Sequence, residues 1–215
     1  MAFDRTQAEG TLVEILDQLN GDQVVGMGVR LPGDLVATTC QCLPRPTGSV
    51  ILPDPDAPSL PVLVRLRKLR SQKAASAVVA AADPFSGLAL LRSAAAAGLD
   101  VPDELNPDLS ADELIAEVAP AAPALAPPLD GPAFLFTPER RWVEGTVTGS
   151  TLSLQGEADL RGARAGTPVF DERGQVVGLV GACDEAGLEA RLCLLAEHLP
   201  GWALRMARAA EAARE

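Results

Sequence analysis

The four cysteines and the single histidine are the first side chains to consider as members of a reactive centre. Cys40 and Cys42 stand two positions apart and could ligate a metal, but no second Cys or His pair lies at the spacing of a zinc site. Cys183 and Cys193 lie in apolar runs and are typical of small core residues. His198 is the sole histidine, so it cannot form a multi-histidine metal site. We therefore predict four reduced structural thiols, no metal and no cofactor.

A dense group of basic residues is the second chemically interesting feature of this acidic chain. Its members are Arg65, Arg67, Lys68, Arg70 and Lys73. In a strand, Arg65 and Arg67 project from one face while Val64 and Leu66 project from the other. Two interpretations stay open. The group is either a solvated edge strand protected by charge, or a docking patch for an acidic segment, from a partner or from the chain's own residues 100–117. The candidate protein-binding residues of such a patch are Arg65, Arg67, Lys68 and Arg70.

Composition excludes several classes of function. The 215 residues are 47% hydrophobic and 22% charged, as in a globular protein, and carry a net charge of -11, which argues against nucleic-acid binding. No apolar run reaches the length of a membrane span, and the N-terminus lacks a secretory pattern, so we expect a cytoplasmic protein with no membrane partner. The segment GDQVVGMGV lacks the Lys of a phosphate-binding loop, and no small-molecule substrate is inferred.

The first part of the chain reads as a helix followed by short strands. Leu12, Ile15, Leu16 and Leu19 have helical spacing and predict a short amphipathic helix over residues 6–19. Short runs broken by Gly and Pro then predict six strands, at residues 24–31, 34–43, 49–52, 61–69, 77–82 and 88–92. This pattern favours a small antiparallel barrel or sandwich.

Residues 94–130 differ in composition. They carry seven acidic residues and no Lys or Arg between positions 100 and 117. Ser110 and Glu113 form a capping box before Leu114 and Ile115, which predicts one short helix. The stretch APAAPALAPP, residues 119–128, is expected to be an extended linker between two halves.

Strand signals then resume. AFLF, RWVEGTVTGS, TLSLQ, TPVFD, QVVGLVGA and EARLCLL predict six more short strands, and the Ala- and Arg-rich tail after Gly201 predicts a helix. The expected boundaries are residues 1–21 for the N-terminal helix, 22–93 for a first barrel, 94–130 for the insert and linker, 131–199 for a second barrel and 200–215 for the C-terminal helix.

Three stretches in this order resemble the trypsin-like serine proteases in their compact bacterial form. Residues 163–182, ARAGTPVFDERGQVVGLVGA, are similar to the segment GxSGxPVxDxxGxVVGLV that carries the family's nucleophile. Residues 25–43 resemble the strand pair that ends in the catalytic histidine, and SGLALLR resembles the segment SDLALLR that carries the catalytic aspartate. The resemblance implies a mostly β fold of two six-stranded antiparallel barrels, with a short N-terminal helix, an inserted helix and a C-terminal helix. An unrelated β-barrel protein is the alternative.

The family's catalytic residues do not carry over. Its histidine falls on Gln41, its aspartate on Gly87 and its serine on Ala165, while the glycine of its oxyanion hole falls on Ala163. Acyl transfer by this fold needs a hydroxyl nucleophile, an imidazole base and a carboxylate that orients the base. A shifted alignment does not restore this set, because His198 is on the last segment whereas the family's base comes from the first barrel. The resemblance therefore implies a pseudoprotease with no catalytic residues, and not an enzyme.

A fold that has lost its catalytic groups still offers a surface for binding. We expect a protein-binding or regulatory scaffold with a protein partner, in a bacterial signalling or defence system. Two alternatives stay open: an enzyme that uses residues other than the triad, and a protein cut by a partner protease in the Ala/Pro-rich linker.

Overall fold

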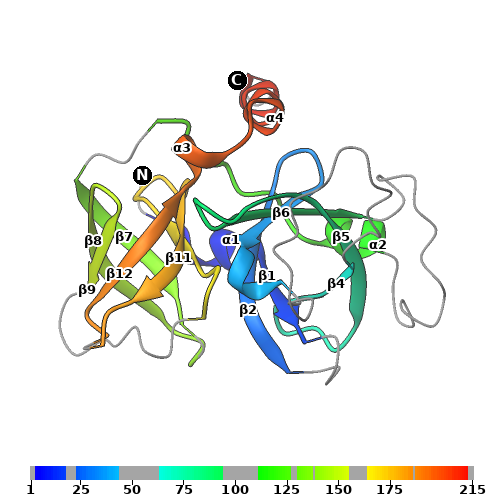
Figure 1. Cartoon of the computed structure of the whole chain (residues 1–215), viewed down its shortest axis with the longest axis horizontal. Helices are drawn as coiled ribbons and strands as arrows, with labels where there is room; N and C mark the ends of the chain where they lie inside the picture. Colours follow the sequence, from blue (N-terminus) through cyan, green and yellow to red (C-terminus); the bar gives the residue numbers. More distant parts are fainter. Residues whose placement is uncertain are drawn as a thin grey trace.

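A computed structural model shows a mostly β protein built from two closed six-stranded antiparallel barrels, as expected (Figure 1). It describes residues 3–17, 23–43, 63–93, 111–126, 130–137, 139–154, 164–185 and 187–212. The first barrel contains β1 (Leu12–Leu16), β2 (Val24–Leu31), β3 (Leu35–Thr39), β4 (Leu63–Lys68), β5 (Ala74–Asp83) and β6 (Leu88–Ser93). The second contains β7 (Gly131–Phe136), β8 (Trp142–Thr148), β9 (Thr151–Leu154), β10 (Pro168–Phe170), β11 (Val176–Cys183) and β12 (Glu189–Leu194).

The helices are short and lie outside the barrels. They are α1 (Arg5–Glu9), the 3-10 turn η1 (Cys40–Cys42), α2 (Ala111–Glu117), α3 (Leu195–His198) and α4 (Gly201–Ala212). In Figure 1, α4 stands above the two barrels, close to the C-terminus. No helix within the described ranges is long and apolar enough to span a membrane.

The helix predicted over residues 6–19 is wrong for most of its length. Asp4 caps a single turn of helix by accepting hydrogen bonds from the amides of Thr6 and Gln7, and the chain then enters strand β1. All five β1 residues are buried. Val13 packs inside the first barrel and Leu12 packs in the cluster shared with the second, so a strand buried on both faces shows no alternation. The first barrel therefore begins at Leu12, not at residue 22, and the strand expected at residues 49–52 lies outside the described part.

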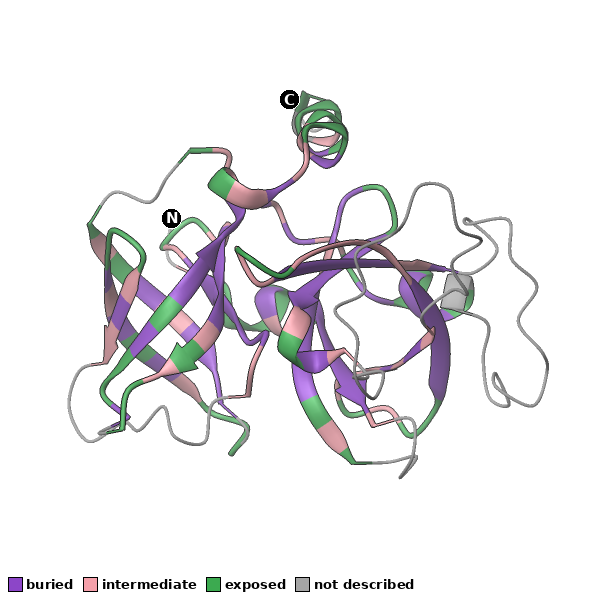
Figure 2. Cartoon of the chain, in the orientation of Figure 1, coloured by how far each residue is buried: buried purple, intermediate pink, exposed green. Residues whose placement is uncertain are grey.

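Three apolar clusters hold the molecule together, and their burial is visible in Figure 2. One fills each barrel, and the third joins residues of both, including Leu12 from β1 and Phe170 from β10. An aromatic group extends this junction: the ring of Phe3 stacks on Phe134 at 4.4 Å and meets Trp142 edge-on at 5.0 Å. The N-terminal segment thus binds the second barrel before the chain enters the first.

The described parts of the insert and the linker, residues 111–126, pack against the barrels. The predicted inserted helix is present as α2, and its Leu114 and Ile115 pack in the core cluster of the first barrel at 1% and 2% exposure. The segment that follows is not a free extended linker. The amide of Ala121 donates to the carbonyl of Arg30 at 2.8 Å, and that of Ala124 donates to Val176 at 2.9 Å, so this segment is bonded to both barrels.

Candidate functional site

The fold brings together, where the barrels meet, the three positions that the sequence resemblance assigns to the catalytic triad. Gln41 lies in η1, Gly87 lies in the turn between β5 and β6, and Ala165 lies just before β10. The amide of Cys40 donates to the carbonyl of Gly87 at 2.7 Å. On the other side of Gln41, the thiol of Cys42 donates to the carbonyl of Ala165 at 3.2 Å. Hydrogen bonds from the two neighbours of Gln41 therefore tie η1 to both other positions.

At the histidine position, Gln41 is exposed while its two neighbours are held in place. The thiol of Cys40 lies 3.3 Å from the carbonyl oxygen of Leu88, and that of Cys42 lies 3.4 Å from the hydroxyl of Thr39. Burial raises the pKa of Cys40, and the charge of Asp83 adds to this effect. The primary amide of Gln41 does not titrate near neutral pH, so this position supplies no general base.

At the aspartate position, Gly87 has no side chain and adopts a left-handed backbone with φ of 80°. Its amide donates to the carbonyl of Asp83 at 2.8 Å, which closes the β5–β6 turn. The carboxylate of Asp83 is engaged in the same turn. Hydrogen bonds from the Ser86 side chain and the Phe85 amide hold the pKa of Asp83 below its usual value, and the charge of His198 contributes further. Asp83 therefore serves as a cap for its own turn.

At the serine position, Ala165 offers only a methyl group in a tight turn pressed against the first barrel. The amide and the hydroxyl of Thr167 both donate to the carbonyl of Arg164, at 3.1 and 2.6 Å. The Ala165 carbonyl accepts from the amide of Met27 at 2.9 Å. Gly166 has φ of 77°, and a Cβ there would lie 2.2 Å from the carbonyl oxygen of Met27. Ala163 lies outside the described residues.

The sequence did not predict that His198, Asp83 and Cys193 interact electrostatically near this junction. His198 follows β12, and the pKa of Asp83 responds to its charge, although the two residues lie far apart in sequence. Within the described chain, His198 forms its ion pair with Glu197 at 3.9 Å, and none joins it to Asp83. Burial, with the charges of Cys40 and Asp83, raises the pKa of Cys193 to about 12, so its thiol stays protonated. The grouping does not form a nucleophile–base relay, and no group of three potential metal ligands occurs among the residues described.

The strand that carries the basic residues, β4, is not an edge strand, so the interpretation of the basic group as a charge-protected edge is wrong. β4 pairs with β1 on one side and β5 on the other, as the closed barrel requires. The alternation predicted for it is confirmed: Val64 and Leu66 are buried inside the barrel, while Arg65 and Arg67 face outward and are half-buried.

The basic side chains meet acidic residues of the same chain. Arg67 contacts Glu14 at 2.7 Å, and these side chains are only 18% and 10% exposed. Lys68 lies 3.9 Å from Glu117 of the inserted helix, and Arg70 lies 2.5 Å from Glu9 of α1. The last two pairs involve side chains 24% to 57% exposed. Arg65 also has an interaction within the fold.

The ion pairs of the basic side chains differ in their contribution to stability, because they differ in burial. Removing one partner of a buried pair costs about 3–5 kcal/mol, because the other charge stays desolvated, whereas an exposed pair contributes about 0–1 kcal/mol. The ion pair between Arg67 and Glu14 is therefore costly to break, and Arg67 is not free to bind another carboxylate. Lys68 and Arg70 are held loosely enough for another carboxylate to compete.

Comparison with known proteins identifies the fold. The chain has the fold of trypsin-like serine proteases, the chymotrypsin fold. The active form of the M. tuberculosis protease Rv3671c is similar, with a TM-score of 0.52 and 18% identity over 90% of this chain and 81% of that one. Kallikrein-related peptidase 10 has a TM-score of 0.56 at 14% identity, covering 96% of this chain and 100% of the peptidase. The human pathogenic astrovirus serine protease has a TM-score of 0.53 at 16% identity, covering 89% and 94%. No protein-family model and no curated protein matches the sequence.

Proposed function

We propose that this chain is a catalytically inactive homologue of trypsin-like proteases that acts as a protein-binding or regulatory scaffold. The observation that carries the proposal is the identity of the residues that the fold gathers at the barrel junction. Gln41, Gly87 and Ala165 supply no base, no orienting carboxylate and no nucleophile. The proposal extends to a partner protein in a bacterial signalling or defence system.

An exposed aromatic ring supports the binding role. Phe85 is 96% exposed, and it stands on the β5–β6 turn that carries Gly87. Covering a phenylalanine ring stabilises a contact by about 1.5–3 kcal/mol, and aromatic residues are enriched in protein interfaces. A partner that docks over the degenerate site would cover this ring.

The alternative of a cut in the linker receives little support from the described part of that segment. Ala121, Pro123 and Ala124 are buried, and a parallel bridge joins Pro123 to Val176 of β11. Proteolysis there would require local unfolding, because a protease binds its substrate as an exposed, extended chain. For the alternative of an enzyme that works without the triad, the described residues offer no group of three potential metal ligands.

Two measurements test the proposal. The purified chain should neither hydrolyse peptide or ester substrates nor react with a fluorophosphonate probe, with an active trypsin-like protease as positive control. Stoichiometric labelling of any serine would overturn the catalytic part. For the binding part, a photoreactive phenylalanine analogue at position 85 should crosslink a discrete partner in the source cells. The same analogue at Leu188, another exposed apolar residue, is the matched control and should not. Equal crosslinking from both positions contradicts a specific binding surface at the junction.

A further inference from the structure

The ring of Phe85 projects from the turn between β5 and β6 and makes almost no contact with its own chain. It is 96% exposed, whereas no other large apolar side chain of the described residues is more than 49% exposed. The chain has five phenylalanines, and the other four lie in the aromatic group at the barrel junction: Phe3, Phe134, Phe136 and Phe170. Phe85 is therefore the one phenylalanine that does not serve the core.

The turn that carries this ring is held in place by hydrogen bonds. The amide of Gly87 donates to the carbonyl of Asp83 at 2.8 Å, and the amide of Phe85 donates to the Asp83 carboxylate at 3.0 Å. The amide of Cys40 fixes the carbonyl of Gly87 at 2.7 Å, and Pro84 restricts the backbone directly before the ring. Binding through this ring loses little conformational entropy, because the backbone is already ordered and phenylalanine has few rotatable bonds.

A negative charge lies at the base of the ring. The Ser86 side chain and the Phe85 amide hold the pKa of Asp83 below its usual value, so this carboxylate is ionised at neutral pH. The hydroxyl and amide donors are neutral and leave the charge uncompensated. No ion pair in the described ranges includes Asp83, and the nearby imidazole of His198 forms its ion pair with Glu197. The turn thus presents an apolar ring beside a negative charge.

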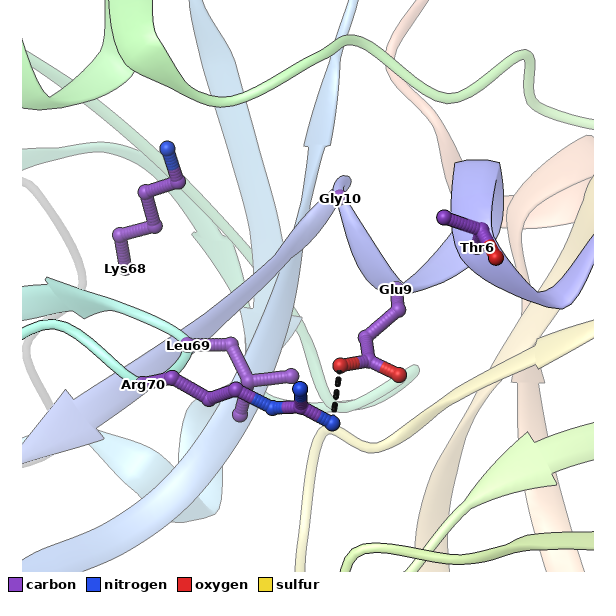
Figure 3. Close-up of a pocket in the computed structure, with 6 residues that line it drawn as sticks. All are labelled: Thr6, Glu9, Gly10, Lys68, Leu69 and Arg70. Carbon is purple, nitrogen blue, oxygen red and sulfur yellow. Dashed lines mark ion pairs between the residues drawn. The ribbon is translucent and has the colours of Figure 1, made fainter.

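A second copy of this chain is a poor host for the ring. The described residues form a cavity of about 330 Å³ on the first barrel, lined by Thr6, Glu9, Gly10, Lys68, Leu69 and Arg70 (Figure 3). Figure 3 shows the guanidinium of Arg70 and the carboxylate of Glu9 pointing toward one another there. A benzyl ring would remove water from these charges without replacing its hydrogen bonds. The net charge of -11 also opposes contact between two copies.

We infer that Phe85 is an anchor residue that inserts into an apolar pocket of a partner protein, and that a Lys or Arg lies at the rim of this pocket, opposite Asp83. The pocket wall removes the ring from water, and the rim cation pairs with the uncompensated carboxylate. The acidic turn on an acidic chain also favours a basic partner surface during association. The inference rests on the proposed binding function and names the chemistry of the partner surface.

The test uses the full chain and two host molecules that reproduce such a pocket. β-Cyclodextrin has an apolar cavity that accepts a benzyl ring and a rim of neutral hydroxyl groups, and its per-amino derivative has the same cavity with an ammonium rim. NMR of isotope-labelled phenylalanine rings follows binding near 0.1 M salt, where screening over about 10 Å weakens attraction by distant charges. Both hosts should shift the resonances of Phe85 alone. The amino host should bind about two- to fivefold more tightly, through Asp83.

Three variants assign these effects. Phe85→Ala should lack the responding resonance, and no other ring should respond in its place. Asp83→Asn keeps an oxygen that accepts from the Phe85 amide but removes the charge, so the two hosts should bind it equally. Glu144→Gln removes an exposed carboxylate on the second barrel and is the matched control, which should keep the preference for the amino host.

Several results would overturn the inference: no response from Phe85, equal affinities of the two hosts for the natural chain, or an unchanged preference in Asp83→Asn. Self-association, or binding to phosphatidylcholine vesicles, that Phe85→Ala abolishes would also overturn it, because a second copy or a lipid surface would then be the occupant. Crosslinking from position 85 reports separately on the proposed function. A crosslinked partner with no host binding would keep the binding role and contradict the pocket, whereas host binding with no crosslink would contradict the binding role alone.

Discussion

The thiol of Cys42 donates a hydrogen bond to the carbonyl of Ala165 at 3.2 Å, and this contact joins the two barrels beside Gln41. Gly26 of β2 makes the approach possible. A Cβ at Gly26 would lie 2.2 Å from the sulfur of Cys42 and 3.0 Å from the Ala165 oxygen. The barrels thus meet here through backbone groups and the small side chain of Cys42.

Gly26→Ala should destabilise the protein, because the added methyl group cannot fit without displacing Cys42 and the Ala165 turn. Overpacking of this kind costs about 1–3 kcal/mol. Urea unfolding measures the loss. Gly201→Ala is the control: its Cβ would make one ordinary contact, 3.6 Å from the Arg205 guanidinium, so its midpoint should stay the same or rise. An unchanged midpoint for Gly26→Ala would show that the junction is looser than these distances indicate.

Restoring the triad with Gln41→His, Gly87→Asp and Ala165→Ser should yield little or no activity. Position 87 has φ of 80°, so an aspartate there starts from a strained backbone, although there is room for its Cβ. Position 163 also departs from the family pattern, and losing one oxyanion donor costs about a hundred- to a thousandfold in rate. The measurement is kcat/KM on an activated ester, beside the Gln41→His/Ala165→Ser double variant. Robust turnover by the triple variant would contradict this account of the site.

Most of the strand pattern could be predicted from the sequence, and the exception has a physical cause. All six strands of the second barrel were predictable because turn residues separate short runs, as at Gly174 between β10 and β11. β1 was not predictable, since burial of Leu12 on one face and Val13 and Ile15 on the other leaves no alternation to detect. The spacing of its apolar residues then imitates a helix.

The ion pairs of the basic strand could not be predicted, because they depend on register. Glu14 faces Arg67 only because β1 and β4 pair with these residues opposite one another. Glu9 reaches Arg70 because α1 ends one turn before β1 begins. The family resemblance predicted that Gln41, Gly87 and Ala165 lie close together. Local sequence patterns could not predict this, because only the closure of two barrels brings such distant positions together.

Arg67 and Glu14 should show strong coupling in a double-mutant cycle. Arg67→Met alone leaves the Glu14 carboxylate nearly buried and unpaired, which should cost about 3–5 kcal/mol of unfolding free energy. Arg67→Met with Glu14→Leu should recover most of this loss, because no buried charge remains. The exposed pair Arg5–Glu144, treated in the same way, should show coupling of at most about 1 kcal/mol. Additive effects at Arg67 and Glu14 would contradict the assignment of a desolvated pair.

The inserted helix should stabilise the first barrel through its buried face. Leu114 and Ile115 are nearly inaccessible and pack with the barrel interior, so Leu114→Ala and Ile115→Ala should each cost about 2–5 kcal/mol. Ala116 is exposed on the same helix, and Ala116→Gln should have little effect. Thermal unfolding of the three variants decides the matter, and equal stabilities would mean that α2 is dispensable for the barrel.

Ionisation of Cys193 should make the protein less stable as the pH rises above 9. The pKa of this thiol is raised from 9.0 to about 12 in the folded protein, chiefly by burial, whereas in the unfolded chain the thiol ionises near its ordinary value. Below pH 9 the thiol is protonated in both the folded and the unfolded chain, so the folded protein has its full stability there. Above that pH only the unfolded chain loses the proton, so stability falls by up to about 1.4 kcal/mol per pH unit until the folded thiol also ionises near pH 12.

The measurement is the urea midpoint from pH 8 to 10.5 under reducing conditions, for the natural chain and Cys193→Ala. Other groups titrate in this range in both proteins, so the difference between their two curves isolates the thiol. The natural chain should lose stability more steeply than Cys193→Ala above pH 9. Cys183→Ala, which leaves Cys193 in place, is the control for removal of a thiol and should retain the steep dependence. Parallel curves for the natural chain and Cys193→Ala would show that this sulfur is not desolvated, and that the core cluster joining the two barrels admits water beside β12.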